Sequence, residues 1–515
     1  MDDSLYLFCS GLVIAALVWL FNPFRRLESQ MGAKLPDGVR SFEYMPGPKG
    51  WPFFGDIFSY LKDADFKQQI AQLKSNFAKY GPIFKMTILG RTVVLIQDPE
   101  DVEIVIKADG RYPMRPKQGL TALEKYMKIR GIPKSIAFRE GVEWNRMRKA
   151  LAPKMLRPKD IRENMENFTA VTRDAIEHMV SIRGADMEIP DLSKELAQWA
   201  TESVGTMAFD VRVGLYDDPP NKDTVRMVQS TMDSFALMGK LSRGWESLFW
   251  RFFTTPTYRK FCEATDTSFA MSQKIVDNKV AELNKMAEEG GAFDDNQSVS
   301  LLTYLLMKGE LTPEEINMNS IGMFRAGVET TSNAMLWLLY HLANNPKVQQ
   351  RVYEEVLSLI GPHGDFNSES FAKLQYIKAC VKESMRLHPI ASRWARVLNQ
   401  DVALSGYNVP SNTVIVYSNY LSGRSEELFK FPLEYRPERW LNEDLGKIHP
   451  FASLPFGVGP RMCIGRRIAE AEIYLLAAKI VQRFILEYQG EPASMMFRLV
   501  AVPDRTLKIK FIDRQ

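Results

Sequence analysis

The chain has 515 residues, of which 45% are hydrophobic and 25% are charged, and such a composition excludes an intrinsically disordered protein. Its formal net charge of +4 is small for this length, so we expect no nucleic-acid partner. Only four cysteines occur, which excludes a disulfide-rich framework and fits a reducing compartment.

The N-terminal segment predicts a membrane anchor. Residues 5–21 contain no charged side chain, and this length lies near the lower limit for a membrane-spanning helix. Acidic residues 2–3 precede the stretch and basic residues 25–26 follow it, so the positive-inside rule places the body of the protein in the cytosol. A cleaved signal peptide is the alternative, but a basic start and a clear cleavage site are both missing. We therefore predict a single-pass anchor over residues 1–26.

A linker is predicted over residues 27–52. It ends in the stretch Pro46–Pro52, whose prolines fix a stiff, extended path. We predict that residues 53–515 form one large domain, which is long enough to bury a large core.

The domain is expected to begin with a small β part. Apolar and polar residues alternate around residues 84–88, and residues 93–96 follow a turn, so both segments are predicted strands. Asp98 then fits a helix N-cap, with Pro99 at the first helical position.

The next region is predicted to be helical. Trp144 and Arg148 are four residues apart and therefore share one helix face. Residues 237–253 are rich in Leu, Met, Phe and Trp, which fits either a roof over a cavity that also touches lipid or ordinary core packing. Both interpretations of this segment stay open.

A long central helix is predicted to begin at Thr312. Thr312 is followed by Pro313 and Glu315, the pattern of an N-cap, an N1 proline and a capping box. No proline interrupts the sequence until Pro346, so the helix is expected to exceed thirty residues.

This helix contains the stretch AGVETT at residues 326–331. A glycine inside a helix costs about 1 kcal/mol relative to alanine, so Gly327 needs a local reason such as the close approach of another group. Thr330 is expected to bond back to the carbonyl of Ala326 and open the helix slightly. The alternative is a glycine that serves only helix packing and a structural threonine.

Two charged clusters follow. Glu383 and Arg386 lie at helical spacing on one face, and Arg439 belongs to the later stretch PERW at residues 437–440. These three side chains are predicted to form a structural charge network. A basic patch is also predicted, formed by Lys378, Lys382, Arg466 and Arg467, although an ordinary solvated helix face is the alternative.

The most specific stretch is the loop FGVGPRMCIG at residues 456–465. It places Cys463 between glycines and just before a helical run, where backbone N–H groups and the helix dipole favour a thiolate. A lone cysteine beside a glycine turn would more often be a buried structural residue. The fixed spacing of Phe, Gly, Arg, Cys and Gly argues against that alternative.

These motifs resemble the cytochrome P450 family. The loop matches the pattern FxxGxRxCxG, and WxxxR, [AG]Gx[DE]T[TS] and ExxR precede it in the expected order, so the resemblance extends from about Pro46 onward. It implies a mainly α fold with a minor β part: a single large catalytic domain, here behind an N-terminal membrane segment.

The resemblance also implies roles for individual residues. Cys463 would be the axial ligand of haem b, and Thr330 and Glu329 would be catalytic, orienting oxygen and relaying protons. The remaining residues implied to bind the cofactor are Trp144, Arg148, Arg396, Phe456, Gly459, Arg461 and Gly465, with the arginines directed at the haem propionates. His388, in an LHP turn, is not expected to be a ligand.

The implied function is a haem-thiolate monooxygenase that hydroxylates or epoxidises a steroid, fatty acid or terpenoid with O2. The alternatives are an isomerase or dehydratase of lipid hydroperoxides and a non-enzymatic haem gas sensor. The stretches LQYIKACVKESMRLHP and RMCIGRRIAEAE look like the animal mitochondrial branch, which implies an acidic ferredoxin as electron donor at Lys378 and Lys382. The leader instead favours the endoplasmic reticulum and a diflavin reductase, because it lacks the composition of a mitochondrial presequence.

Overall fold

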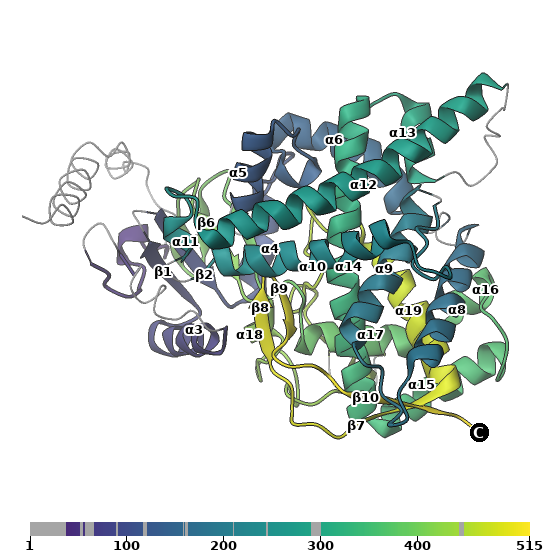
Figure 1. Ribbon diagram of the computed structural model, residues 1–515. Coiled ribbons are helices and arrows are strands. Elements are labelled where there is room, and N and C mark those ends of the chain that lie inside the picture. Colours follow the sequence, from purple (N-terminus) through teal and green to yellow (C-terminus); the bar gives the residue numbers. More distant parts are fainter. Residues whose placement is uncertain are drawn as a thin grey trace, which may run out of the picture.

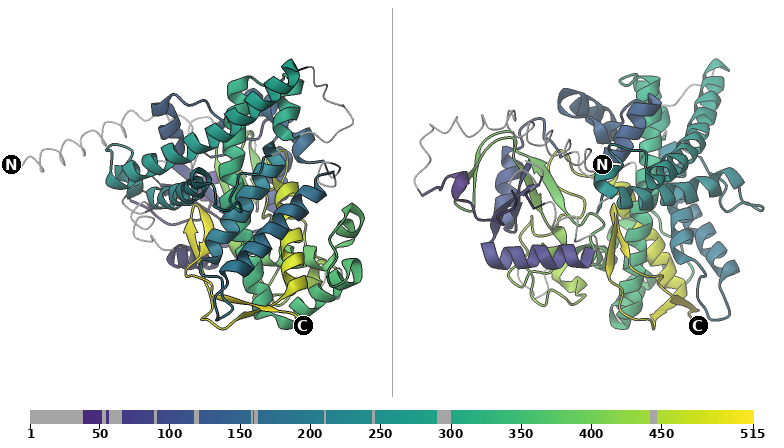
Figure 2. Two further views of the ribbon diagram at one scale, coloured as in Figure 1. Left: turned by 45° about the vertical axis from the view of Figure 1, so that its right-hand side comes forward. Right: turned by 60° about the vertical axis from the view of Figure 1, so that its left-hand side comes forward.

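A helical body and a smaller strand-rich part lie side by side in the computed structural model (Figures 1 and 2). The residues it describes are 38–51, 55–56, 66–88, 91–116, 121–157, 159, 163–209, 211–243, 246–289, 300–441 and 447–515. The predicted balance of mainly α with a minor β part is confirmed. The predicted anchor over residues 1–26 lies outside the described residues. Among the helices of these ranges, none combines the length and apolar character that crossing a membrane requires.

The helices account for most of the described chain. Their bounds are α3 (Phe66–Tyr80), α4 (Pro99–Ala108), α5 (Thr121–Arg130), α6 (Gly141–Met155), α8 (Met165–Ile182), α9 (Leu192–Phe209), α10 (Lys222–Leu241), α11 (Glu246–Phe249), α12 (Pro256–Glu288), α13 (Leu301–Lys308), α14 (Pro313–Asn344), α15 (Pro346–Ile360), α16 (Ser368–Lys373), α17 (Tyr376–Leu387), α18 (Asn419–Ser422) and α19 (Arg466–Arg483). Short 3-10 helices occur at η2 (Phe42–Tyr44), η3 (Ile136–Phe138) and η4 (Pro437–Trp440).

The strands form one four-stranded sheet and three pairs. The sheet has the order β1-β2-β6-β3, with β1 (Ile83–Ile88), β2 (Arg91–Ile96), β3 (Trp394–Val397) and β6 (Val414–Tyr417). Only β2 and β6 run parallel in it. The three pairs are β4 (Val402–Leu404) with β5 (Tyr407–Val409), β7 (Phe484–Tyr488) with β10 (Ile509–Asp513), and β8 (Met495–Arg498) with β9 (Val500–Pro503).

The predicted start of the β part is confirmed. β1 and β2 pair antiparallel, and α4 then begins with Pro99 in its first turn. The carboxylate of Asp98 accepts a hydrogen bond from the Glu100 N–H at 2.9 Å, as an N-cap does. These residues therefore fold as their local sequence signals predict.

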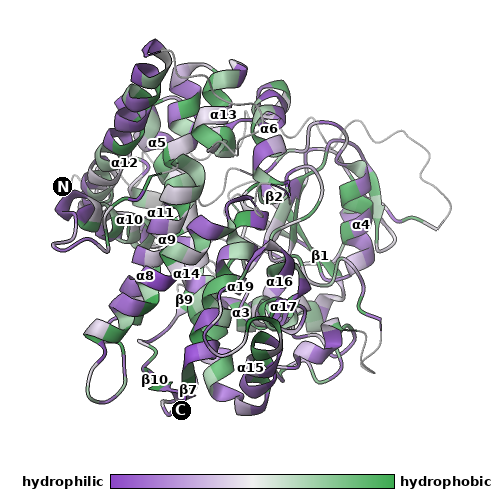
Figure 3. Cartoon of the chain, turned by 90° about the vertical axis from the view of Figure 1, so that its right-hand side faces the viewer, coloured by the Kyte–Doolittle hydropathy of each residue, from purple (hydrophilic) through white to green (hydrophobic). Residues whose placement is uncertain are grey.

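Helix α14 runs through the centre of the helical body (Figure 1). Its capping box is present, because Thr312 Oγ1 accepts from the Glu315 N–H at 3.3 Å and Glu315 Oε2 accepts from the Thr312 N–H at 3.1 Å. Trp337 and Leu338 are fully buried, as are nearly all residues of the adjacent helix α9. The central helix is therefore enclosed by protein, whereas outer helices such as α15 alternate between hydrophilic and hydrophobic residues (Figure 3).

The segment predicted as either a roof or core packing covers the end of α10 and the whole of α11. Met238, Leu241 and Trp250 are buried, which fits core packing. Phe252 and Phe253 are 79% and 66% exposed, which does not fit core packing. The segment thus combines a packed inner side with an aromatic outer side.

Candidate functional site

The cysteine loop is closed by its own backbone. The Cys463 N–H donates to the carbonyl of Phe456 at 2.8 Å, and the Met462 N–H donates to that of Gly459 at 3.0 Å. Gly457 and Gly459 have φ angles of +70° and +74°, which glycine adopts without the strain of a Cβ. The loop ends at the N-terminus of α19 and holds the sulfur in a fixed position.

A cavity of about 710 Å³ joins this loop to α14. This volume is within the range of ligand pockets, which is about 300–1,000 Å³. The residues predicted from the motifs that line it are Gly327, Thr330, Arg396, Phe456, Arg461, Cys463 and Gly465. Trp144, Arg148, Glu329 and Gly459 are not among its lining residues.

Two buried arginines are held at the edge of the cavity by acidic partners. Arg396 Nε donates to Asp109 Oδ2 at 2.8 Å, and Arg461 Nη2 pairs with Glu140. The indole of Trp144 lies behind Arg461, with its ring centre 4.1 Å from the guanidinium carbon. Burial lowers the pKa of Arg461 to about 10, so it remains cationic at neutral pH. Trp144 therefore orients an arginine rather than facing the cavity itself.

Cys463 opens onto the cavity, but the cavity lies deep in the protein. Desolvation there raises the pKa of the thiol, while the Gly465 N–H and the cations Arg115, Arg148 and Arg466 lower it by a smaller amount. The Gly465 N–H at the helix end favours the thiolate, as the sequence predicts, but the desolvation cost is larger. A metal ion that binds the sulfur would reverse this balance, since a coordinating thiol is deprotonated.

The wall formed by α14 fits only part of the sequence prediction. Thr330 Oγ1 donates to the Ala326 carbonyl at 2.7 Å, as predicted. Gly327 lines the cavity, but a Cβ added to it would lie 2.6 Å from Val204 Cγ2 on α9. A helix therefore restricts this position, which fits the packing alternative, while the same glycine also borders the cavity.

Glu329 follows the cavity-lining Gly327 and precedes Thr330 but is not itself among the lining residues. Its side chain is 5% exposed, and its Oε2 atom has no hydrogen-bond partner among the residues that the structure describes. Burial raises the pKa of Glu329 to about 7, and the charge of Arg498 on β8 opposes that rise. The carboxyl group can therefore gain and lose a proton near neutral pH.

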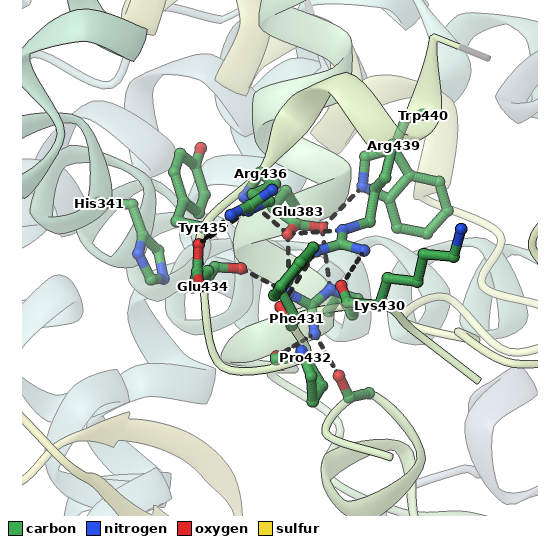
Figure 4. Close-up of polar contacts among 12 residues, drawn as sticks. His341, Glu383, Lys430, Phe431, Pro432, Glu434, Tyr435, Arg436, Arg439 and Trp440 are labelled. Atoms are coloured by element: carbon green, nitrogen blue, oxygen red, sulfur yellow. Dashed lines mark hydrogen bonds and ion pairs between the residues drawn. The ribbon is translucent and has the colours of Figure 1, made fainter. Parts of the chain in front are cut away.

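The predicted charge network around Glu383 is present (Figure 4). Arg386 binds Glu383 through two hydrogen bonds of 2.9 and 2.7 Å, and Arg439 Nε donates to the same carboxylate at 2.9 Å. Trp440 Nε1 and the Arg436 N–H also donate to it, each at 2.9 Å. Five donors thus fix one fully buried carboxylate, which joins α17 to the segment around η4.

Comparison with family models matches residues 45–511 to the model described as Cytochrome P450. The chain belongs to the cytochrome P450 family. It is therefore an oxidoreductase of the monooxygenase type, and its cofactor is haem b. Because the match covers nearly the whole described chain, it applies to the fold as well as to the cysteine loop.

Several curated relatives are similar along almost their full length. The 1,25-dihydroxyvitamin D(3) 24-hydroxylase, mitochondrial, of Rattus norvegicus is 30% identical over 482 residues, covering 93% of this chain and 91% of the relative. The sterol 26-hydroxylase, mitochondrial, of the same organism is 30% identical over 492 residues, covering 93% and 90%. Cytochrome P450 10 of Lymnaea stagnalis is 29% identical over 507 residues, covering 96% and 91%.

The side chains of the cavity fit haem b. The Cys463 thiol, Gly327 and Thr330 line the same interior, and so do the guanidinium groups of Arg115, Arg396 and Arg461. Such cationic donors suit the two carboxylates of the cofactor. Within the described ranges no group of three metal-ligating side chains is assembled.

The predicted basic patch is only partly exposed in this P450. Lys378 is half-buried, its Nζ donates to the Ala372 carbonyl at 3.0 Å, and burial lowers its pKa. Lys382 is exposed, with its Nζ 5.9 Å from the centre of the Trp440 ring. Arg466 pairs with Glu470 at 2.9 Å. Arg467 lies 3.9 Å from the same carboxylate, so Lys382 presents the least restrained charge of the four.

The motifs missed several polar residues that line the cavity, among them the three described next. Arg115 belongs to none of the motifs recognised in the sequence. It donates a hydrogen bond to the Arg461 carbonyl, and burial lowers its pKa to about 10. Glu472 accepts from Ser203 Oγ at 2.7 Å, and burial raises its pKa to about 8. Trp394 is the third. Of these three, only Glu472 could have been placed near the cysteine loop from the sequence. It lies seven residues, about two helical turns, after Gly465 and so on the same side of the helix.

Proposed function

We propose that this P450 hydroxylates a lipophilic substrate of the sterol or secosteroid class. The reaction takes RH, O2, two electrons and two protons to ROH and water. The observation that carries the proposal is that Cys463 and Thr330 line one cavity. Two observations support the substrate class. The cavity has apolar lining residues, Met207, Ala208, Met323, Leu499 and Val500, and the relatives are named as hydroxylases of a sterol and of a dihydroxyvitamin D.

The first proposed role is to hold the cofactor. Cys463 would bind the iron, and Arg396, Arg461 and Arg115, which line the cavity, would donate charge-assisted hydrogen bonds to the haem carboxylates. Arg148 lies outside the lining residues and would add a positive charge nearby. Phe456, Gly459 and Gly465 would shape the loop around the sulfur. When bound, haem b supplies electron acceptance and oxygen activation, which no protein side chain can provide.

The second proposed role is proton delivery from α14. The hydroxyl of Thr330 donates to the Ala326 carbonyl at 2.7 Å, which leaves its oxygen lone pairs for a proton donor in the cavity. Glu329 would supply protons, because a pKa of about 7 leaves it partly protonated at neutral pH. Thr330→Ala should divert reducing equivalents to hydrogen peroxide, measured against product formed. Fully coupled turnover by the variant would remove Thr330 from the path.

The third proposal is that an acidic ferredoxin delivers the electrons in mitochondria. It is supported by the relatives whose printed names include "mitochondrial" and by the exposed Lys382. The test compares turnover of a sterol substrate with ferredoxin and its reductase against turnover with a diflavin reductase. Activity with the diflavin reductase alone would reject mitochondrial electron transfer and favour the reticulum.

The docking face is tested separately. Lys382→Glu should raise the KM for ferredoxin several-fold, and Lys378→Glu should have a smaller effect because its amine is already held by the Ala372 carbonyl. Lys285→Glu, on the exposed outer part of α12, is the matched control. Equal KM values for the three variants would reject this face.

We also propose that the aromatic outer side of the roof contacts a membrane surface. Phe249, Phe252 and Phe253 are 49%, 79% and 66% exposed, and Trp51 in the proline-rich stretch is 70% exposed. Aromatic side chains are favoured at the level of lipid headgroups. Replacing Phe252 and Phe253 together by Ser should weaken flotation of the protein with liposomes. Unchanged flotation would leave the predicted anchor over residues 1–26 as the membrane contact.

A further inference from the structure

Trp394 carries a polar group that the fold leaves without a partner. Its side chain is 5% exposed and lines the haem cavity from strand β3. Among the described residues, no atom accepts a hydrogen bond from its Nε1–H. Buried indole N–H groups usually find an acceptor, because an indole can only donate. The cavity is therefore the place to look for that acceptor.

The position of the indole shows which part of the cavity the N–H faces. Trp394 and Arg396 are two residues apart on β3, so their side chains lie on the same face of the strand. The guanidinium carbon of Arg396 lies 4.8 Å from the centre of the Trp394 ring. Trp394 Cδ1, the carbon bonded to Nε1, would lie 3.8 Å from a Cβ added to Gly457. The N–H edge thus faces the loop that bears Cys463, next to Arg396.

This end of the cavity gathers donors and few free acceptors. Arg396 and Arg461 are cationic, and the nearby carboxylates, Asp109 and Glu140, already pair with them. An anionic ligand group is the complement of such a set. Haem b brings two carboxylates into this cavity, whereas a sterol brings none.

We propose that the Trp394 indole N–H donates a hydrogen bond to a haem propionate, beside Arg396. The inference rests on the arrangement of the haem carboxylates given under Proposed function. A neutral donor would anchor the carboxylate without adding another charge to the arginine cluster. It would also withdraw negative charge from the propionate, and the reduction potential of the haem would therefore be higher than in its absence.

Trp337 provides a matched control. Its Nε1–H is also buried without a described partner, but Trp337 lies in the core of α14 and stacks on His388 at 3.8 Å rather than lining the cavity. A substitution at Trp337 therefore removes an unpartnered buried indole without touching the cofactor site.

The experiment uses the holoenzyme and the variants Trp394→Phe and Trp337→Phe. Trp394→Phe should shift the propionate bending band in the resonance Raman spectrum, lower the haem reduction potential, and speed haem transfer to apomyoglobin by about tenfold. Trp337→Phe should leave all three unchanged. A Trp394→Phe protein whose propionate band matches wild type would overturn the inference, even if haem release were faster, because lost packing alone could cause that.

Two further arms keep the result interpretable. If Trp394→Phe fails to fold, Trp394 is replaced by benzothienylalanine, which preserves the shape of the indole and substitutes sulfur for N–H, and the same band shift is required. Arg396→Lys tests the underlying arrangement. A band shift for Arg396→Lys without one for Trp394→Phe rejects the role of Trp394 alone, whereas no shift in either variant rejects the arrangement of the carboxylates.

Discussion

The fully buried carboxylate of Glu383 gives the sharpest prediction about stability. Its Oε1 atom accepts hydrogen bonds from Arg386 Nη2, Arg439 Nε and the Arg436 N–H. Its Oε2 atom accepts from Arg386 Nε and Trp440 Nε1. Glu383→Gln preserves the size of the side chain but replaces one acceptor oxygen by an NH2 group and removes the charge. Whichever way the amide turns, its NH2 group faces at least two N–H donors.

The expected cost follows from these contacts. Losing two hydrogen bonds to a charged group costs about 3–6 kcal/mol, at about 1.5–3 kcal/mol each. Breaking a buried ion pair by removing one partner costs about 3–5 kcal/mol, which agrees with the cost worked out from the two hydrogen bonds. Since a folded domain is stable by only about 5–15 kcal/mol, Glu383→Gln should lose much of its stability. Trp440→Phe removes one donor of the five and should cost about 1.5–3 kcal/mol.

The assay is urea unfolding of the holoenzyme followed by circular dichroism, together with the fraction of protein that retains haem. Glu434→Gln is the control, because its carboxylate is 56% exposed and pairs with the half-exposed Arg436, so the change should stay within about 1 kcal/mol. If Glu383→Gln unfolds at the same urea concentration as Glu434→Gln, the network does not stabilise the fold as the geometry requires.

Three other buried groups give predictions for the same unfolding assay. Burial lowers the pKa of His341 from 6.5 to about 3, so the free energy of unfolding should fall as the pH drops from 6.5 toward 3. His341→Gln should reduce the slope of the free energy of unfolding against pH by up to about 1.4 kcal/mol per pH unit. An unchanged slope would contradict this. Burial raises the pKa of Glu472 from 4.5 to about 8, so the wild-type protein should lose stability as the pH rises from 4.5 to 8. Glu472→Gln removes this titration, and its free energy of unfolding should exceed that of the wild type by an amount that grows over the same interval. A difference that does not change with pH would contradict this. Arg325 is 4% exposed, and the hydrogen bond described for it is one of 3.0 Å to Ser234. Because its buried charge is costly to desolvate, Arg325→Met should be neutral or stabilising by about 1 kcal/mol or more. A clear loss of stability would refute that.

Features set by local sequence were predictable. The capping box of Thr312 and the N-cap of Asp98 depend on residues within one helical turn, and the structure has both. The Thr330 back-bond depends on the preceding turn of the same helix and is also present. The contact of Arg439 with Glu383 crosses a longer stretch of chain, and it was predictable only because the motifs resemble those of a family.

Features set by packing were not predictable. Val93 on β2 pairs with Val414 on β6, and nothing local to either strand specifies a partner so distant in sequence. The tight contact at Gly327 comes from α9, so its cause became visible only in the folded chain. The raised pKa of the Cys463 thiol depends on desolvation, which is a property of the whole cavity and not of the loop.

The direct test of the central claim is the absorption spectrum of the reduced carbon monoxide complex, because thiolate ligation by Cys463 produces a strongly red-shifted Soret band. We predict that band for the wild-type protein and for Cys262→Ser, whose sulfur lies outside the cavity. We predict its loss in Cys463→His while haem remains bound. A Cys463→His protein that keeps the red-shifted band would contradict the assignment of Cys463 as the iron ligand.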